Sequence, residues 1–257
     1  LGDGPSEKII NPFNSEIKIT ENMLFAVDYK NTLRSFNISD GSELWNFQTE
    51  NSFAISDTIN SLIVIDNLVI FSNSIGDITA VDIENGLITW QLPTQSTNII
   101  NESYKFRNSK LVSDKKSIIF SNNKDEFYSI DIKTGVANWI NEVNSSVTPI
   151  LIGNLIFTVS NEGYLFVIEK NNGNIIRITD LYKNYKEKKQ ADIKPIGFVI
   201  GNRNLYLTNS DGQMLVIDLV TGKSIYNIKV AKSFVSEPFI SNENLFVIRK
   251  GSIIQYN

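Results

Sequence analysis

The sequence contains no cysteine and no histidine among its 257 residues. Without cysteine there are no disulfides, no thiolate zinc sites and no cysteine nucleophiles. Without histidine there is no Ser-His-Asp or Cys-His mechanism and no histidine-ligated metal. We therefore expect no catalytic residues, no metal site and no cofactor.

Long apolar runs and a strong charge of one sign are lacking as well. Runs such as residues 68–71 are far shorter than the roughly 20 apolar residues of a membrane-spanning helix, so we predict no transmembrane segment. The net charge is −4 and the pI is about 5.1. This overall balance gives no electrostatic case for binding nucleic acid or an anionic membrane surface.

What the sequence does contain is one phrase repeated five times. A carboxylate or amide residue is followed four places later by glycine and, usually, by an aromatic residue four places after that. Glycine supplies the positive φ of a turn, and the carboxylate or amide can accept hydrogen bonds from the turn's N–H groups. We predict that the aromatic ring fills the wedge between neighbouring sheets. The structural residues of the repeat are Gly41, Trp45, Gly86, Trp90, Gly135, Trp139, Gly173, Gly222 and Tyr226.

The spacing of the repeats predicts the fold class. The five glycines are separated by 45, 49, 38 and 49 residues, which suits a four-stranded antiparallel sheet. Within one repeat, residues 154–160, 164–169 and 174–179 are apolar, β-branched runs separated by Asn- and Gly-containing turns. We predict an all-β protein, a β-propeller of four-stranded antiparallel blades, with residues 1–257 in a single domain.

The last repeat is incomplete, with predicted strands only at residues 237–240, 244–249 and 252–257. Its sheet would keep an open edge unless another segment pairs with it. One alternative is a ring of six blades, closed by a strand from residues 7–11. The other is a larger ring whose N-terminal part is missing from a sequence that begins at Leu1.

The repeat also resembles a known family. Thr-Ala-Val-Asp at residues 79–82, followed by Gly86 and Trp90, is similar to the repeat of pyrroloquinoline-quinone-type propellers, many of which bind no quinone. Ser-Glu-Pro-Phe at residues 236–239 and the terminal strand at residues 251–257 resemble the B subunit of the bacterial outer-membrane β-barrel assembly machinery. This resemblance runs over nearly the whole chain.

The resemblance implies an eight-bladed propeller that is a periplasmic lipoprotein, anchored to the outer membrane by a lipid upstream of this chain. It implies a non-catalytic scaffold for protein–protein interaction in the assembly of outer-membrane β-barrel proteins. The implied partner is a barrel-assembly subunit or a nascent outer-membrane protein.

Long connections on a rigid scaffold are where binding residues tend to lie. The two longest are residues 94–110 and 180–194, and residues 51–55 place apolar side chains among polar ones. Solvated connections are the simpler interpretation of the first two, and residues 51–55 are more simply the approach to the next inner strand than a loop with an exposed apolar anchor. The candidates for partner binding are Phe53, Ile55, Tyr104, Phe106, Arg107, Tyr182 and Tyr185.

Two other functions are open. A quinone-dependent dehydrogenase would need a tryptophan beneath the quinone, calcium ligands and a carboxylate base, but the three tryptophans occupy equivalent positions, which favours a structural role. A glycan-binding or hydrolytic propeller could use the pair Asp125 and Glu126, or Asp57 with Asp66. Adjacent residues of a strand point to opposite faces, so solvated turn residues explain these carboxylates better.

Overall fold

The structure, a computed structural model, describes residues 12–50, 59–94, 107–232 and 235–256. The chain divides into two compact units, residues 1–111 with 131–136 and residues 112–130 with 137–257, and each is described by itself. That residues 1–257 form a single domain therefore stays a prediction.

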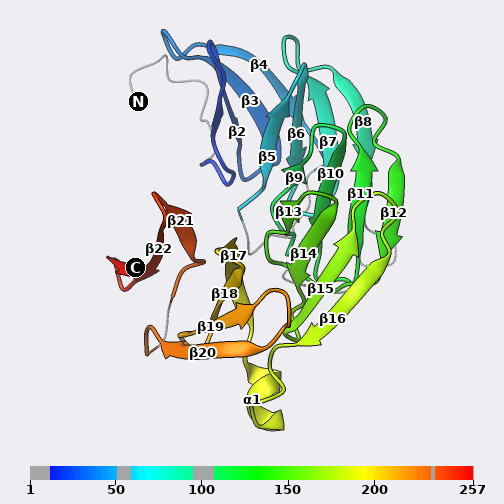
Figure 1. Cartoon of the computed structure of the whole chain (residues 1–257). Coiled ribbons are helices and arrows are strands. Elements are labelled where there is room, and N and C mark those ends of the chain that lie inside the picture. The colour runs from blue at the N-terminus through cyan, green and yellow to red at the C-terminus, as the bar shows by residue number, and fades with distance from the viewer. Residues whose placement is uncertain (1–11, 51–58, 95–106, 233–234, 257) are drawn as a thin grey trace. The chain divides into compact units, whose positions relative to one another are not determined.

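The first unit contains two four-stranded sheets, coloured blue to cyan in Figure 1. The strands of the first sheet are β1 (Lys18–Ile19), β2 (Met23–Val27), β3 (Thr32–Asn37) and β4 (Glu43–Gln48). Those of the second sheet are β5 (Leu62–Ile65), β6 (Leu68–Ser72), β7 (Ile78–Asp82) and β8 (Ile88–Leu92).

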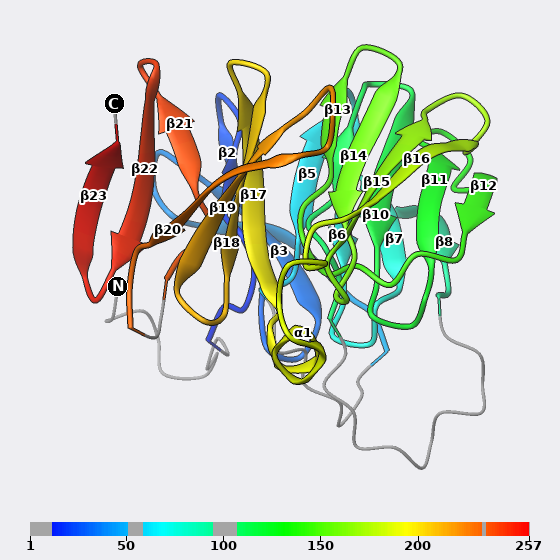
Figure 2. The ribbon, with the colours of Figure 1, turned by 60° about the horizontal axis from the view of Figure 1, so that its bottom comes forward.

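The second unit contains the remaining sheets and the one described helix, α1 (Glu187–Asp192), as Figure 2 shows. The third sheet is formed by β9 (Val112–Ser113), β10 (Ser117–Ser121), β11 (Phe127–Asp131) and β12 (Ala137–Asn141), and its last turn belongs to the first unit. The fourth is formed by β13 (Ile150–Ile152), β14 (Leu155–Val159), β15 (Tyr164–Glu169) and β16 (Ile175–Asp180). The fifth is formed by β17 (Pro195–Gly201), β18 (Asn204–Asn209), β19 (Gln213–Asp218) and β20 (Ser224–Lys229). The sixth has β21 (Phe239–Ser241), β22 (Asn244–Arg249) and β23 (Ser252–Tyr256).

Every sheet is an antiparallel meander in which each strand pairs with the next along the chain. The predicted strands at residues 154–160, 164–169 and 174–179 are confirmed as β14, β15 and β16, and β13 completes their sheet. The last repeat has three strands in the described residues, as predicted. The all-β propeller fold with four-stranded blades is thus confirmed, whereas the number of blades in a closed ring stays a prediction.

The repeated phrase forms the turn between the third and fourth strands of five sheets. In the third sheet, Oδ1 of Asp131 accepts hydrogen bonds from the N–H groups of Lys133, at 3.0 Å, and Thr134, at 2.9 Å. The N–H of Gly135 donates to the carbonyl of Asp131 at 2.9 Å, and the glycine has a φ of 69°. Only glycine adopts this conformation without a steric cost, which explains the glycine of the phrase.

The core of each unit lies between successive sheets, because the consecutive apolar residues of inner strands such as β6 and β14 point to both faces of their sheets. In the first unit, Phe25 and Leu33 pack with Leu62 and Phe71 of the following sheet, and all four are fully buried. In the second unit, clusters of buried residues join the third sheet to the fourth, the fourth to the fifth and the fifth to the sixth. No helix among the described residues is long and apolar enough to cross a membrane.

Candidate functional site

The tryptophans of the repeat join each sheet to the turn of the next repeat. The indole N–H of each donates to the carbonyl of the residue after that turn's carboxylate, at 3.1 Å for Trp45, 2.7 Å for Trp90 and 2.8 Å for Trp139. Each ring also covers the glycine of the same turn, and a Cβ built on Gly135 would lie 2.6 Å from the Trp90 ring. The three rings are therefore engaged in contacts between sheets.

Arg177 makes the corresponding contact in the fourth sheet, where the repeat departs from its pattern. Its Nη2 donates to the carbonyl of Leu219 at 2.6 Å, and its Nη1 donates to that of Val220 at 2.8 Å. Leu219 follows Asp218 and so occupies the position whose carbonyl the tryptophans use in other repeats. The guanidinium thus replaces an indole as the donor, which the sequence pattern marked only as a departure.

Tyr226 holds the aromatic position in the fifth sheet and is 64% exposed. It lies on β20 opposite Val216 of β19. Its side chain is much more exposed than that of Trp90, which is only 8% exposed at the same repeat position. Position in the repeat therefore does not decide whether the ring is buried, because burial depends on what the following sheet places over it.

The connection that follows β16 contains two of the candidate partner-binding residues, Tyr182 and Tyr185. Tyr182 is 1% exposed, its ring lies against Gly163, and its hydroxyl donates to Oδ1 of Asn209 at 2.7 Å. The hydroxyl of Tyr185 donates to Oε1 of Gln213 at 3.2 Å. Both tyrosines thus bind the connection to the fifth sheet through hydrogen bonds. Because the Tyr182 ring is buried, a partner could not contact it in this structure.

Electrostatics keep these two tyrosines neutral. Burial, with the nearby Tyr185 and Asp211, raises the pKa of Tyr182. Burial and the carboxylate of Asp211 also raise the pKa of Tyr185, against a hydrogen bond from Asn227 that lowers it. A neutral phenol is the form that donates the hydrogen bonds described above.

The remaining partner-binding candidates belong to residues 51–55 and to the connection at residues 94–110. Phe53, Ile55, Tyr104 and Phe106 fall outside the described residues. Arg107 is described, and its side chain is exposed.

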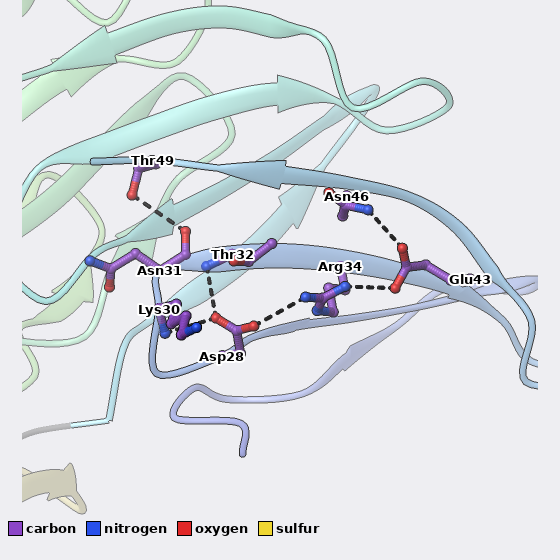
Figure 3. Close-up of polar contacts among 8 residues, drawn as sticks. All are labelled: Asp28, Lys30, Asn31, Thr32, Arg34, Glu43, Asn46 and Thr49. Carbon is purple, nitrogen blue, oxygen red and sulfur yellow. Dashed lines mark hydrogen bonds and ion pairs between the residues drawn. The ribbon is translucent and has the colours of Figure 1, made fainter. Parts of the chain in front are cut away.

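The first sheet contains a polar network that the sequence pattern did not predict (Figure 3). Asp28, whose side chain is fully buried, accepts the N–H groups of Lys30 and Thr32 through Oδ1, at 2.8 and 3.0 Å. Its Oδ2 lies 3.3 Å from Nη2 of Arg34, and Nη1 of Arg34 lies 2.7 Å from Oε2 of Glu43. The network links β2, β3 and the start of β4.

The chemistry of this network is structural. The buried carboxylate has both an ionic partner and backbone donors, which is how a buried charge is stabilised. Asn73 and Asn122 occupy the position of Asp28 in the second and third sheets and likewise accept two backbone N–H groups of their hairpins. The carboxylate of Asp28 therefore caps its turn as the amides of Asn73 and Asn122 cap theirs. The only feature of the sequence that indicated an ion pair here was the charged Arg34 within a strand.

Of the carboxylates considered for hydrolysis, the structure describes Asp66, Asp125 and Glu126. Asp66 and Asp125 lie in turns with positive φ, 50° and 63°, as solvated turn residues should, and Asp57 falls outside the described residues. Glu126 accepts a hydrogen bond from Asn122 at 2.8 Å. Within residues 12–50, 59–94, 107–232 and 235–256, no group of three acidic side chains is placed to hold a metal ion.

Comparison with known proteins assigns the chain to a family. The family model described as outer membrane protein assembly factor BamB matches residues 6–179. The chain belongs to the BamB family. A search of curated proteins by sequence found no match.

Solved structures agree with this BamB-family assignment at the level of the fold. BamB from Moraxella catarrhalis has a TM-score of 0.73 and 14% identity, over 96% of this chain and 77% of that one. Sqt1 from Saccharomyces cerevisiae has a TM-score of 0.67 and 12% identity, over 92% and 67%. A quinohemoprotein alcohol dehydrogenase from Comamonas testosteroni has a TM-score of 0.63 and 10% identity, over 85% and 43%.

Proposed function

We propose that this BamB-family chain is a non-catalytic scaffold that binds a protein partner during the assembly of outer-membrane β-barrel proteins. The observation that carries the proposal is the family match over residues 6–179. Its site of action would be the periplasm, at an outer membrane to which an N-terminal lipid anchors the protein. The partner would be a barrel-assembly subunit or a nascent outer-membrane protein.

The internal contacts of the polar and aromatic residues support a binding role without catalysis. Trp45, Trp90 and Trp139 each pack against the glycine of the next repeat's turn and donate their N–H to that turn, so part of each ring is already occupied within the protein. The carboxylate of Asp28 is already bound to an arginine and to backbone N–H groups. The whole chain also lacks the histidine and cysteine on which many catalytic sites depend.

The candidate contact residues are those of the long connections. We propose that Phe53, Ile55, Tyr104, Phe106 and Arg107 contribute the aromatic, apolar and arginine side chains that protein interfaces favour. Tyr185 is half-buried at the edge of the fifth sheet and would contribute at the margin. For Tyr182, we propose a role in holding its connection in place.

The test is a titration calorimetry measurement of binding to the periplasmic domains of the barrel-forming subunit. We expect saturable binding that weakens at least tenfold in a Tyr104→Ala/Phe106→Ala/Arg107→Ala variant, because loss of central aromatic and arginine contacts costs about 2 kcal/mol or more. The matched control is Lys116→Ala/Lys133→Ala/Lys223→Ala, which removes three exposed side chains elsewhere. Absence of binding by the unaltered protein would overturn the proposal.

A second candidate rests on the fold shared with the quinohemoprotein alcohol dehydrogenase. If this chain were such an enzyme, pyrroloquinoline quinone with Ca²⁺ should quench its tryptophan fluorescence and support alcohol-dependent reduction of a dye. We expect neither signal, because the indole rings are packed on the glycines of neighbouring turns. If the dye were reduced faster than by free quinone, the proposed scaffold function would be wrong and the protein would be an oxidoreductase.

A further inference from the structure

Lysine side chains gather at one end of the fourth and fifth sheets, around the connection that contains α1. We call this surface the basic face. Its lysines are Lys183, Lys186, Lys188, Lys189, Lys194, Lys229 and Lys232, and its carboxylates are Glu162, Asp180, Glu187, Asp192 and Asp211. The basic face therefore has a net charge of +2, whereas the whole chain has a net charge of −4.

The fold brings the last two lysines to this surface from a distant part of the sequence. Nζ of Lys229 donates to the carbonyl of Asp211 at 2.7 Å, and Nζ of Lys189 lies 3.0 Å from the Asp211 carboxylate. Lys232 follows Ala231, whose N–H donates to the carbonyl of Gly212 at 3.0 Å. One turn, between β18 and β19, thus holds lysines from two separate segments.

The same turn also holds the end of the connection. The N–H of Lys194 donates to Oγ of Ser210 at 2.9 Å, and the N–H of Ser210 donates back to the Lys194 carbonyl at 2.8 Å. Within the connection, Nε2 of Gln190 donates to the carbonyls of Tyr182 and Tyr185, at 3.0 and 2.9 Å. The connection that carries these lysines is therefore held in place by hydrogen bonds.

The connection turns its aromatic rings inward and its charges outward. Tyr182 is buried, and Tyr185 bonds to the fifth sheet and lies beneath Nζ of Lys189, which is 4.6 Å from its ring centroid. Lys183, Lys186 and Lys188 are all exposed. Helix α1 buries none of its six residues, and it projects beyond the strands beside it (Figures 1 and 2).

We propose that the basic face binds the anionic headgroup layer of a phospholipid membrane. A projecting set of exposed lysines can approach a flat surface together, and each lysine near such a surface strengthens binding by roughly fivefold. The attraction acts within a Debye length, about 8 Å at physiological ionic strength, so the local charge of the face decides it, not the net charge of the chain. This inference goes beyond the proposed scaffold function and does not depend on it.

A protein partner fits the basic face less well. Protein interfaces are enriched in tyrosine, tryptophan and arginine at their centres and are depleted in lysine. On this face the tyrosines are committed to internal hydrogen bonds, and every exposed positive charge is a lysine ammonium group. A headgroup layer needs no complementary pocket, because it attracts each ammonium group separately.

The experiment is cosedimentation of the full chain with vesicles of phosphatidylcholine alone, or of phosphatidylcholine mixed with the anionic lipid phosphatidylglycerol. We expect binding only to the anionic vesicles, weakening as salt is raised from 50 to about 300 mM because of screening. The variant Lys183→Gln/Lys186→Gln/Lys188→Gln should bind about a hundredfold more weakly, roughly fivefold for each lysine. Lys189 is left unaltered because it pairs with Asp211.

The matched control is Lys116→Gln/Lys133→Gln/Lys223→Gln, which makes the same change in net charge with exposed lysines of other turns. It should keep the affinity of the unaltered chain within about twofold, since its lysines lie off the face. Equal losses in both triple variants would overturn the proposal, because net charge alone would then explain binding. So would a lack of binding to anionic vesicles, or binding to poly-glutamate but not to vesicles, which would assign the face to an acidic polypeptide. Circular dichroism and thermal unfolding of each variant establish that it is folded.

Discussion

The contact between Trp90 and Gly135 allows a test of how one repeat is joined to the next. In Gly135→Ala the new methyl group would lie 2.6 Å from the indole ring, at a φ of 69°. The left-handed conformation costs an L-residue about 1–2 kcal/mol, and forcing a buried ring aside costs about 1–3 kcal/mol more. We expect a loss of about 2–5 kcal/mol in the free energy of unfolding, the sum of those two terms.

Trp90→Ala removes the other side of the contact. The ring is 8% exposed, and its N–H donates to the carbonyl of Ile132 at 2.7 Å. Loss of a buried tryptophan costs about 3–5 kcal/mol. In that background the Gly135→Ala methyl has no ring to displace, so only the conformational cost remains, and the double variant should be about 1–3 kcal/mol more stable than the two losses predict when added.

The measurement is equilibrium urea unfolding followed by far-ultraviolet circular dichroism, with the denaturant slope compared across variants. Gly41→Ala is the matched control, because Gly41 has a φ of 73° and a Cβ there would meet nothing within 4 Å. Its loss should add to that of Trp90→Ala within about 0.5 kcal/mol. If Gly135→Ala and Trp90→Ala also added without coupling, the proposed joint between the ring and the next turn would be refuted.

Three further changes test other contacts. Arg177→Met removes the donor to the Leu219 carbonyl and should lower the free energy of unfolding by about 1–3 kcal/mol; an unchanged urea midpoint would show that the arginine does not replace an indole. Tyr182→Phe leaves Oδ1 of buried Asn209 without its tyrosine donor and should cost about 1–2 kcal/mol in the same assay, whereas a neutral result would exclude the bond as a support of the connection. The hydrogen bond from the Thr134 hydroxyl holds the pKa of Asp131 below its ordinary value of 3.8, so its stabilising effect is complete above pH 3.8 and is lost as the pH falls through the lowered pKa. Stability measured from pH 5 downwards should therefore fall less steeply in Asp131→Asn, and identical slopes would contradict this.

Much of the fold could be predicted from the sequence because the signals are local. The positive φ of Gly135 and the turn cap of Asp131 depend on residues within five positions of each other. The runs of apolar and β-branched residues along β14 and β15 likewise depend only on neighbours along one strand. Such short-range constraints survive in any tertiary setting, so repeated copies predict repeated sheets.

The site residues were harder to predict because their roles depend on partners far along the chain. Tyr182, a candidate for partner binding, is buried, and its hydroxyl donates a hydrogen bond to Asn209, which lies 27 residues away in sequence. Arg34 sits in an ordinary strand pattern, and only the neighbouring strands show that it links Asp28 to Glu43. The type of a turn can be predicted from the residues of that turn. The contacts of a side chain cannot be predicted from its own segment when its partners come from distant parts of the chain.

The sequence by itself determined the all-β class, the turn chemistry of the repeated phrase and the absence of histidine- and cysteine-dependent chemistry. Tertiary structure alone decided that Arg177 takes the place of an indole against Leu219, at a separation of 42 residues. It also decided that Lys229 joins the lysines of the connection around Asp211, which gives a local positive surface to a chain whose net charge is negative. The physical reason is that hydrogen bonds of turns form between near neighbours, whereas packing and local electrostatic potential depend on which distant segments the sheets bring together.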